Sequence, residues 1–162
     1  MNFFFPMKSY LVLSGMGKDI NMMTANWVYP ISNNPEYISL AIKEKRYTYK
    51  NIKKYGYFNI IKPDSRLLDY VKKFGLISKY NDEKKMYGFP FEMIIHKEYD
   101  VPILTEFNNL IIKYEREIKV GDRKLIIGRV LDELKFSNKN EDVFQKEFKN
   151  YDEFLVIKWK YI

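Results

Sequence analysis

The stretch Asn21-Met22-Met23-Thr24-Ala25-Asn26-Trp27 departs from the plain alternation of apolar and polar residues that a simple barrel strand shows. It combines small polar side chains, one alanine and a large aromatic ring. A flat heteroaromatic ligand needs close approach to the backbone, N–H and C=O groups for its polar edge, and few bulky side chains nearby. The stretch offers these features. An ordinary strand with a buried tryptophan accounts for it equally well when it is taken alone.

A second stretch, Lys43-Glu44-Lys45-Arg46-Tyr47-Thr48-Tyr49, follows one predicted strand later. Its basic residues and hydroxyl groups lie where a helix is predicted to begin. The first N–H groups of a helix, the helix dipole and Lys or Arg side chains together form a site for an anion such as phosphate. A solvated basic turn is the more common explanation in isolation. A ring-binding segment joined to a phosphate-binding segment by one hairpin is the more specific combination.

Short strands separated by tight turns account for most of the remaining chain, and this pattern favours a barrel or sandwich over a doubly wound sheet. The fold class is therefore mainly β, with two or three peripheral helices. Strands are expected at residues 10–13, 20–28, 37–43, 57–61, 92–95, 109–114, 124–134 and 154–161, with turns at 14–19, 30, 32–35 and 120–122. Helices are expected from Tyr47 or Thr48 to near Gly56, from Asp64 or Ser65 to Gly75, and over residues 141–150.

The chain has 162 residues and no cysteine, which excludes disulfides, thiolate zinc sites, iron–sulfur clusters and a cysteine nucleophile. Its single histidine, His96, excludes a multi-histidine metal site within one chain. If the protein transfers electrons, it must therefore borrow a cofactor. No apolar run approaches the ~20 residues of a membrane span, and the first residues lack the leading positive charge of a signal peptide. We expect a cytoplasmic protein that does not enter the membrane.

The formal net charge of +7 suits anionic partners, although a lysine-rich solvated surface explains it as well. A basic β-barrel that binds nucleic acid is one alternative, because single-strand binders combine basic grooves with stacking rings. The positive charges are interspersed with acidic residues instead of forming a cluster, which argues against this alternative. Residues 14–18 do not match a phosphate loop, because their two glycines are too close together and Asp19 follows the lysine.

The order of motifs along the chain resembles the flavin reductase-like domain family, which has an FMN-binding split-barrel fold. The similarity runs from about residue 11 to residue 134. Its specific part consists of Asn21 to Trp27, Pro30-Ile31-Ser32, Asn34-Pro35, Ile38-Ser39-Leu40-Ala41-Ile42, Arg46-Tyr47-Thr48-Tyr49 and Gly56-Tyr57-Phe58-Asn59-Ile60. Its weaker part consists of Ser78 with Lys84-Lys85, Val101-Pro102-Ile103-Leu104, Gly121-Asp122-Arg123 and Gly128-Arg129-Val130.

The resemblance implies a Greek-key-like split barrel over residues 1–134 that binds FMN rather than FAD. Residues 135–162 would form a C-terminal extension that packs on the barrel or on a partner subunit, since family members are typically homodimers with the flavin near the interface. The implied flavin contacts are Asn21, Met23, Thr24, Ala25 and Asn26 along the isoalloxazine ring with Ser32 nearby, and Ser39, Lys45, Arg46 and Thr48 at the ribityl chain and phosphate. Lys84 or Lys85 would reach the phosphate, from the same or the second subunit.

Many members of the family reduce flavin with NADH or NADPH, and others resemble flavoredoxin, an electron carrier. The resemblance thus implies an NAD(P)H-dependent oxidoreductase with a small-molecule or protein electron acceptor, or an FMN carrier without nicotinamide activity. One departure bears on this choice. The family often has Gly-Asp-His where this chain has Gly121-Asp122-Arg123, and that histidine is associated with the nicotinamide side of the site. Arg123 is therefore a candidate substrate-binding residue, and no catalytic side chain is assigned.

Overall fold

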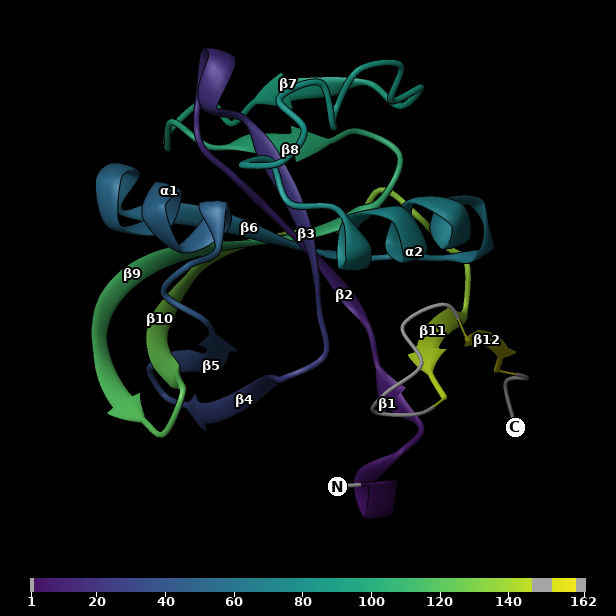
Figure 1. Ribbon diagram of the computed structural model, residues 1–162, viewed down its shortest axis with the longest axis horizontal. Coiled ribbons are helices and arrows are strands. Elements are labelled where there is room, and N and C mark those ends of the chain that lie inside the picture. The colour runs from purple at the N-terminus through teal and green to yellow at the C-terminus, as the bar shows by residue number, and fades with distance from the viewer. Residues whose placement is uncertain (1, 147–152, 160–162) are drawn as a thin grey trace.

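The computed structural model describes residues 2–146 and 153–159, and its largest element is a strongly bent antiparallel sheet (Figure 1). The strand order is β3-β2-β6-β9-β10-β5-β4, so β3 and β4 are the two edges. The strands are β2 (Tyr10–Ser14), β3 (Asn21–Ala25), β4 (Val28–Asn33), β5 (Glu36–Ile42), β6 (Tyr57–Lys62), β9 (Asn108–Val120) and β10 (Arg123–Leu134). The expected fold class, mainly β with peripheral helices, is confirmed.

Both faces of the central strands are covered, which explains the unbroken apolar run in β2. Successive side chains of a strand point to opposite faces. Val12 points into the barrel interior and packs with Phe58 and Ile112. Leu11 and Leu13 point the other way, into a second cluster that includes residues of helix α2 (Leu68–Leu76). The other α-helix, α1 (Tyr47–Tyr55), ends at Gly56 as expected, because Gly56 adopts the left-handed conformation (φ 75°) that caps a helix.

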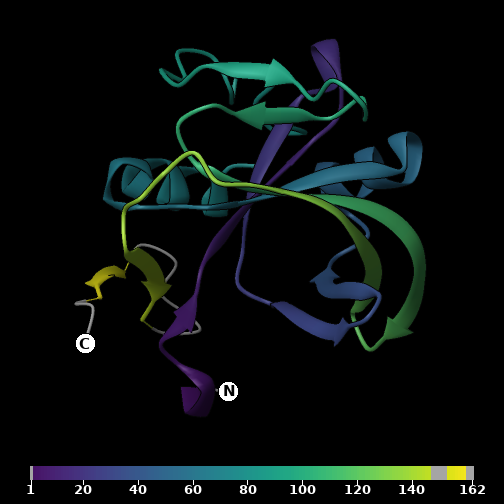
Figure 2. The same cartoon turned by 180° about the vertical axis from the view of Figure 1, so that it is seen from behind.

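Two smaller sheets lie at opposite ends of the molecule, as both views show (Figures 1 and 2). One is the hairpin of β7 (Met93–Ile95) and β8 (Pro102–Leu104). The other joins segments far apart in the sequence, in the order β1-β11-β12. It comprises β1 (Met7–Lys8), β11 (Glu141–Gln145) and β12 (Phe154–Lys158). The described part of the chain also contains short 3-10 helices, at Asn2–Phe4, Gly17–Asp19 and Ser65–Leu67.

The helix expected over residues 141–150 is wrong for its first half, and residues 147–150 lie outside the described part of the chain. Residues 141–145 form β11, which pairs with β1 on one side and β12 on the other. The carboxylates of Glu141 and Asp142 bind groups on neighbouring elements, and Val143 beside them is fully buried. Tertiary pairing therefore decided the conformation of this segment.

The strand expected over residues 20–28 is divided in the structure, because the chain changes partners at Asn26 and Trp27. β3 ends at Ala25 after pairing with β2, and β4 begins at Val28 and pairs with β5. The turn expected at Pro30 and at residues 32–35 is confined to Asn34 and Pro35. Pro30 is accommodated within β4 because β4 is an edge strand and needs no donor on its free side.

Gly75 does not end α2 as expected, since the helix continues to Leu76. A Cβ atom at residue 75 would lie 3.7 Å from Cβ of Thr24, which is an ordinary van der Waals distance, so this position does not require glycine. One turn earlier, Oγ1 of Thr24 donates a hydrogen bond of 2.5 Å to the carbonyl oxygen of Val71. Val71 and Gly75 thus lie on the side of α2 that contacts β3.

Gly128 lies where β10 crosses the packed interior, and we expect Gly128→Ala to destabilise the fold. A Cβ atom at this position would lie 2.3 Å from Cγ2 of Ile112, which is itself fully buried. Overpacking of this kind costs about 1–3 kcal/mol in the free energy of unfolding. Chemical denaturation should show this loss, whereas Arg129→Ala, at the exposed next position, should change stability by at most about 0.5 kcal/mol. Equal stabilities of the two variants would contradict the packing argument.

Candidate functional site

A cavity lies beside β3 and contains about 710 Å³ of empty space, part of it open to solvent. The cavity, here called the ring pocket, is lined by Phe5, Met23, Thr24, Ala25, Asn26, Trp27, Ala41, Ile42, Lys43, Arg46, Gly75, Arg123, Gln145 and Phe154.

Backbone atoms of β3 contribute to the wall of the ring pocket. Residues 23–27 line it consecutively, and consecutive side chains of a strand cannot all point to one side. β3 pairs only with β2, so alternate residues direct their N–H and C=O groups away from the sheet. A flat heteroaromatic ligand needs exposed backbone groups and small neighbouring side chains. The free edge of β3 provides both.

A buried carboxylate fixes the position of α1 next to this edge. Asp19 accepts hydrogen bonds from the hydroxyl groups of Tyr47 (2.9 Å) and Tyr55 (2.7 Å) and from the amine of Lys54 (2.6 Å). These three contacts hold the pKa of Asp19 well below its usual range, with the lysine contact as the largest cause. Asn51 also donates to the carbonyl oxygen of Asp19, at 2.8 Å. α1 is thereby held along its whole length, from Tyr47 to Tyr55, against the turn that precedes β3.

A smaller cavity of about 200 Å³, here called the basic pocket, adjoins the ring pocket and shares Met23 and Arg46 with it. Besides these two it is lined by Asn21, Tyr47, Thr48, Phe74, Ile77, Ser78, Lys79 and Lys85. The first N–H groups of α1, at Tyr47 and Thr48, have no partner within the helix. Among the described residues no carboxylate lines either pocket. Cations and helix N–H groups together make the basic pocket suited to a phosphate.

One polar atom in the basic pocket lacks a partner in the protein. The side-chain amide of Asn21 donates to Oγ1 of Thr48 at 2.7 Å, which fixes the orientation of both residues. Oδ1 of Asn21 is buried and, within the described part of the chain, has no hydrogen-bond donor. A buried acceptor without a donor is costly, so this atom fits a site that a ligand completes.

Lys85 is buried in the same pocket with only 2% of its surface exposed. Its amine lies 5.3 Å from the ring centroid of Phe74, and no described residue accepts a hydrogen bond from it. Burial, together with the nearby positive charges of Arg46, Lys73 and Lys79, lowers the pKa of Lys85 to about 7. An anion placed among these groups would favour the charged amine.

Arg123 and Trp27 line the ring pocket together and contact each other. The guanidinium carbon of Arg123 is 4.1 Å from the centroid of the Trp27 ring, a cation–π contact. Nε of Arg123 is buried without a hydrogen-bond partner in the described structure, and the nearest carboxylate oxygen, on Asp122, is 3.8 Å away. Asp122 is in turn bound by Lys43 at 3.1 Å. Arg123 is thus held mainly by the indole ring, and its charge remains available to an anionic ligand.

The structure brings most of the predicted site residues together. Thr24, Ala25, Asn26 and Arg123 line the ring pocket, Asn21, Thr48 and Lys85 line the basic pocket, and Met23 and Arg46 line both. Four predicted residues lie outside both pockets of this subunit. Lys45 and Lys84 have exposed side chains, whereas Ser32 and Ser39 bond to the carbonyl oxygens of Pro35 and Tyr29 on the β4–β5 hairpin.

Several lining residues were not predicted from the sequence. Lys43 and Trp27 lie within the two stretches that drew attention, so an extension of the same argument would have found them. Lys79 directly follows Ser78, which the weaker part of the resemblance includes, so its neighbourhood was already marked. Gln145 and Phe154 gave no signal, because only the pairing of β1, β11 and β12 brings them to the pocket. Among the described residues no cluster of three His, Asp or Glu side chains is placed to bind a metal.

Comparison with family models gives one decisive match, to the description "Flavin reductase like domain", which covers residues 1–151. The chain belongs to the flavin reductase-like family. An uncharacterised protein of Archaeoglobus fulgidus is 35% identical to this flavin reductase-like chain over 132 residues, which is 81% of the chain and 73% of the relative. The expected family membership is therefore confirmed, and the match extends beyond the boundary expected at residue 134.

Solved structures share the fold of this flavin reductase-like chain at low sequence identity. An FMN-binding protein from Thermus thermophilus gives a TM-score of 0.84 at 17% identity, covering 100% of this chain and 92% of that one. Flavoredoxin from Methanosarcina acetivorans gives 0.82 at 18% identity, covering 98% and 89%. The NADH:FAD oxidoreductase SgcE6 of Streptomyces globisporus gives 0.75 at 15% identity, covering 93% and 86%. The split-barrel fold is thus confirmed.

The two pockets of this flavin reductase-like chain fit the parts of a flavin mononucleotide. The ring pocket offers backbone polar groups and apolar side chains for a planar ring, and the basic pocket offers Arg46, Lys79 and Lys85 for a phosphate. The donor-free Oδ1 of Asn21 lies between helix start and strand, where a hydroxyl group of a ligand would satisfy it. Among the described helices none has the length and hydropathy to cross a membrane.

Proposed function

We propose that this protein is an FMN-binding oxidoreductase that takes electrons from NADH or NADPH and delivers them to an acceptor through the flavin. The observation that carries the proposal is the junction of the ring pocket with the basic pocket at Arg46. A ring site and an anion site that meet at one arginine match a cofactor with an aromatic ring at one end and a phosphate at the other. FMN has this form, whereas the adenylate of FAD would need a further site.

When bound, the flavin would supply the redox chemistry, by accepting a hydride and returning its electrons to an acceptor. The residues of the chain would bind and orient it. The free edge of β3 would contact the polar edge of the ring, and Arg46 with Lys85 would hold the phosphate. Positive charge at Lys43 and Arg123 would favour the anionic reduced cofactor. No side chain needs to act as a general acid or base.

The proposal is tested on purified protein loaded with flavin. Heat-released cofactor is identified by chromatography against FMN and FAD standards. The holoprotein is then mixed anaerobically with NADH and, separately, NADPH while the visible flavin band is followed. We expect release of FMN and loss of the band with at least one donor. A protein that takes up neither flavin would overturn the proposal.

A second candidate function, an FMN carrier without nicotinamide activity, is favoured by one observation. Arg123 stands at the position where the resemblance expects histidine, and it stacks on Trp27 at the ring pocket. Release of FMN combined with no reduction by either nicotinamide, but full reduction by dithionite, would select the carrier.

Under the oxidoreductase proposal, Arg123 binds a phosphate of the nicotinamide donor. Arg123→Ala is then expected to raise the KM for that donor roughly 10- to 150-fold with a smaller change in kcat, because a hydrogen bond to a charged group contributes about 1.5–3 kcal/mol. Steady-state kinetics of the flavin-loaded variant measure both constants. Arg129→Ala, an exposed arginine of the same strand, serves as the matched control. An unchanged KM for both donors would remove Arg123 from the donor site.

We also propose that the protein is a homodimer with the flavin near the interface, located in the cytoplasm. The support for the dimer is a group of exposed apolar side chains on β4 and β9, two strands of the same sheet, namely Tyr29, Ile31, Ile118 and Val120. Ser32 and Ser39, which lie outside both pockets of one subunit, belong to the β4–β5 hairpin that carries part of this group. The support for the location is the absence of cysteine from the sequence.

A further inference from the structure

The β1–β11–β12 sheet forms part of the ring pocket wall. Three of the lining residues belong to it or adjoin it: Phe5, Gln145 and Phe154. Gln145 is the register partner of Met7 on one side and of Phe154 on the other, so these residues form a row across the three strands. The row places the ring of Phe154 at the pocket from a segment more than a hundred residues away from β3 in the sequence.

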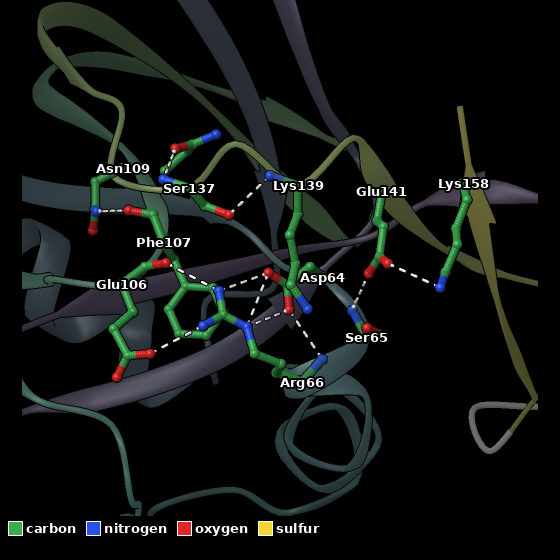
Figure 3. A network of polar contacts seen from close by, with 11 residues as sticks. Asp64, Ser65, Arg66, Glu106, Phe107, Asn109, Ser137, Lys139, Glu141 and Lys158 are labelled. Atoms are coloured by element: carbon green, nitrogen blue, oxygen red, sulfur yellow. Dashed lines mark hydrogen bonds and ion pairs between the residues drawn. The ribbon is translucent and has the colours of Figure 1, made fainter. Parts of the chain in front are cut away.

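The far end of this sheet is anchored to the barrel. Val143 is fully buried in the cluster that contains Leu11, and its carbonyl oxygen accepts a hydrogen bond of 2.7 Å from the backbone N–H of Ser9. Glu141 accepts a hydrogen bond of 2.9 Å from the backbone N–H of Ser65 and forms an ion pair of 3.5 Å with Lys158 (Figure 3). β11 is thereby fixed to the barrel and to β12 at the end away from the pocket.

Asp142 adds a second anchor between Val143 and Glu141. Its Oδ1 atom lies 2.7 Å from the amine of Lys8 and 3.3 Å from the amine of Lys62, and its Oδ2 atom accepts a hydrogen bond of 2.7 Å from Nε1 of Trp159. The contacts join β1, β6 and the residue that follows β12. These contacts fix the position of the β1–β11–β12 sheet. The space that the sheet leaves in the ring pocket is therefore fixed as well.

Asn26 connects this wall to the ring-binding stretch. Its amide donates to Oγ of Ser9 at 2.8 Å and to the carbonyl oxygen of Met7 at 3.4 Å. Met7 is the β1 partner of Gln145. These hydrogen bonds set the distance between the turn after β3 and the β1–β11–β12 sheet.

The groups assigned to the flavin come from β3, α1 and the basic pocket, whereas the rings of Phe5 and Phe154 carry no charge and no polar atom. Their contribution is apolar surface and occupied volume. We infer that the β1–β11–β12 sheet, through Phe154 and Phe5, limits the size of the electron acceptor that can reach the bound flavin. This inference rests on the proposed function and names the acceptor class: small planar molecules are admitted and larger fused rings are excluded.

The test compares acceptors of different size with the proposed donor left out. Flavin-loaded protein is reduced with dithionite, freed of excess reductant, and mixed anaerobically in a stopped-flow instrument with 1,4-benzoquinone or with 9,10-phenanthrenequinone. Each quinone takes up two electrons and two protons to become the hydroquinone while the flavin returns to its oxidised form. The measured quantity is the ratio of the two second-order rate constants, phenanthrenequinone over benzoquinone.

Phe154→Ala is expected to raise this ratio by roughly 10-fold or more, since small differences in pocket fit change specificity by that order. Phe154→Leu should give an intermediate ratio. Phe5→Ala, from the other side of the sheet, should also raise it and carries the test if Phe154→Ala does not fold. Phe136→Ala, which removes a half-exposed ring outside the pocket, should leave the ratio unchanged.

An equal change in both rate constants in Phe154→Ala and Phe5→Ala would overturn the inference and leave the proposed function intact. Failure of the wild-type protein to take up flavin, established by titration beforehand, would overturn the proposed function and the inference together. The two failures are therefore distinguished by the order of the measurements.

Discussion

Arg46→Ala is expected to weaken FMN binding by roughly 10- to 150-fold, which corresponds to about 1.5–3 kcal/mol for a charge-assisted contact to phosphate. Arg46 precedes the first residue of α1 and lines both pockets, so its guanidinium lies where the anion site meets the ring site. The contacts of Asp19 with Tyr47 and Lys54 hold the helix start independently of Arg46. The variant should therefore lose affinity without losing the pocket.

Quenching of flavin fluorescence on titration of the flavin-free protein gives the dissociation constants. Arg129→Ala removes an arginine from an exposed position and should bind FMN as the wild type does. Riboflavin, which lacks the phosphate, supplies a second control, since its affinity should be nearly the same in wild type and Arg46→Ala. Equal FMN affinities of Arg46→Ala and wild type would exclude a phosphate contact of this residue.

The dissociation constant for FMN is expected to rise with pH above pH 7, by up to about tenfold per pH unit. Burial and the positive charges of Arg46, Lys73 and Lys79, opposed by Asp82, lower the pKa of Lys85 to about 7. Above this pH the amine is neutral in the free protein. The phosphate is a dianion there, because its second pKa is about 6, and it raises the pKa of Lys85 on binding. Binding therefore takes up a proton, which becomes harder as pH rises.

Titration calorimetry of FMN binding in buffers of different ionisation enthalpy measures this proton uptake between pH 7 and 9. Lys85→Met should remove the uptake and flatten the pH dependence, at the expense of affinity at pH 7. Lys84→Met, at the exposed neighbouring position, should retain both. A wild-type affinity that stays constant from pH 7 to 9 would show that Lys85 does not meet the phosphate.

The sequence alone was sufficient for the parts of the site that are local. The edge of β3 and the start of α1 are each contained in a short stretch whose residue types reflect what the site needs: small side chains near a ring, and cations near a helix start. Gly56 and the alternation of β5 likewise identified their elements, because capping and periodicity are properties of neighbouring residues.

Long-range pairing accounts for what could not be predicted. Glu141 and Asp142 have carboxylates of the kind that suit the first turn of a helix, yet these groups find their partners on β1, β6 and the segment before α2. The same pairing brings Phe154 to the pocket. Gly75 also misled, since it lies inside α2, which ends at Leu76. No local pattern encodes such contacts.

The order of synthesis gives the β1–β11–β12 sheet a further consequence. Met7 leaves the ribosome early, but its register partner Gln145 is made after most of the chain. At a rate of about 5–20 residues per second, a nascent chain carries β1 unpaired for on the order of ten seconds. The seven-stranded sheet, which needs nothing beyond β10, can form during that interval. Most residues that line the ring pocket and the basic pocket can therefore be in place before β11 and β12 are made. Gln145 and Phe154 then complete the wall of the ring pocket.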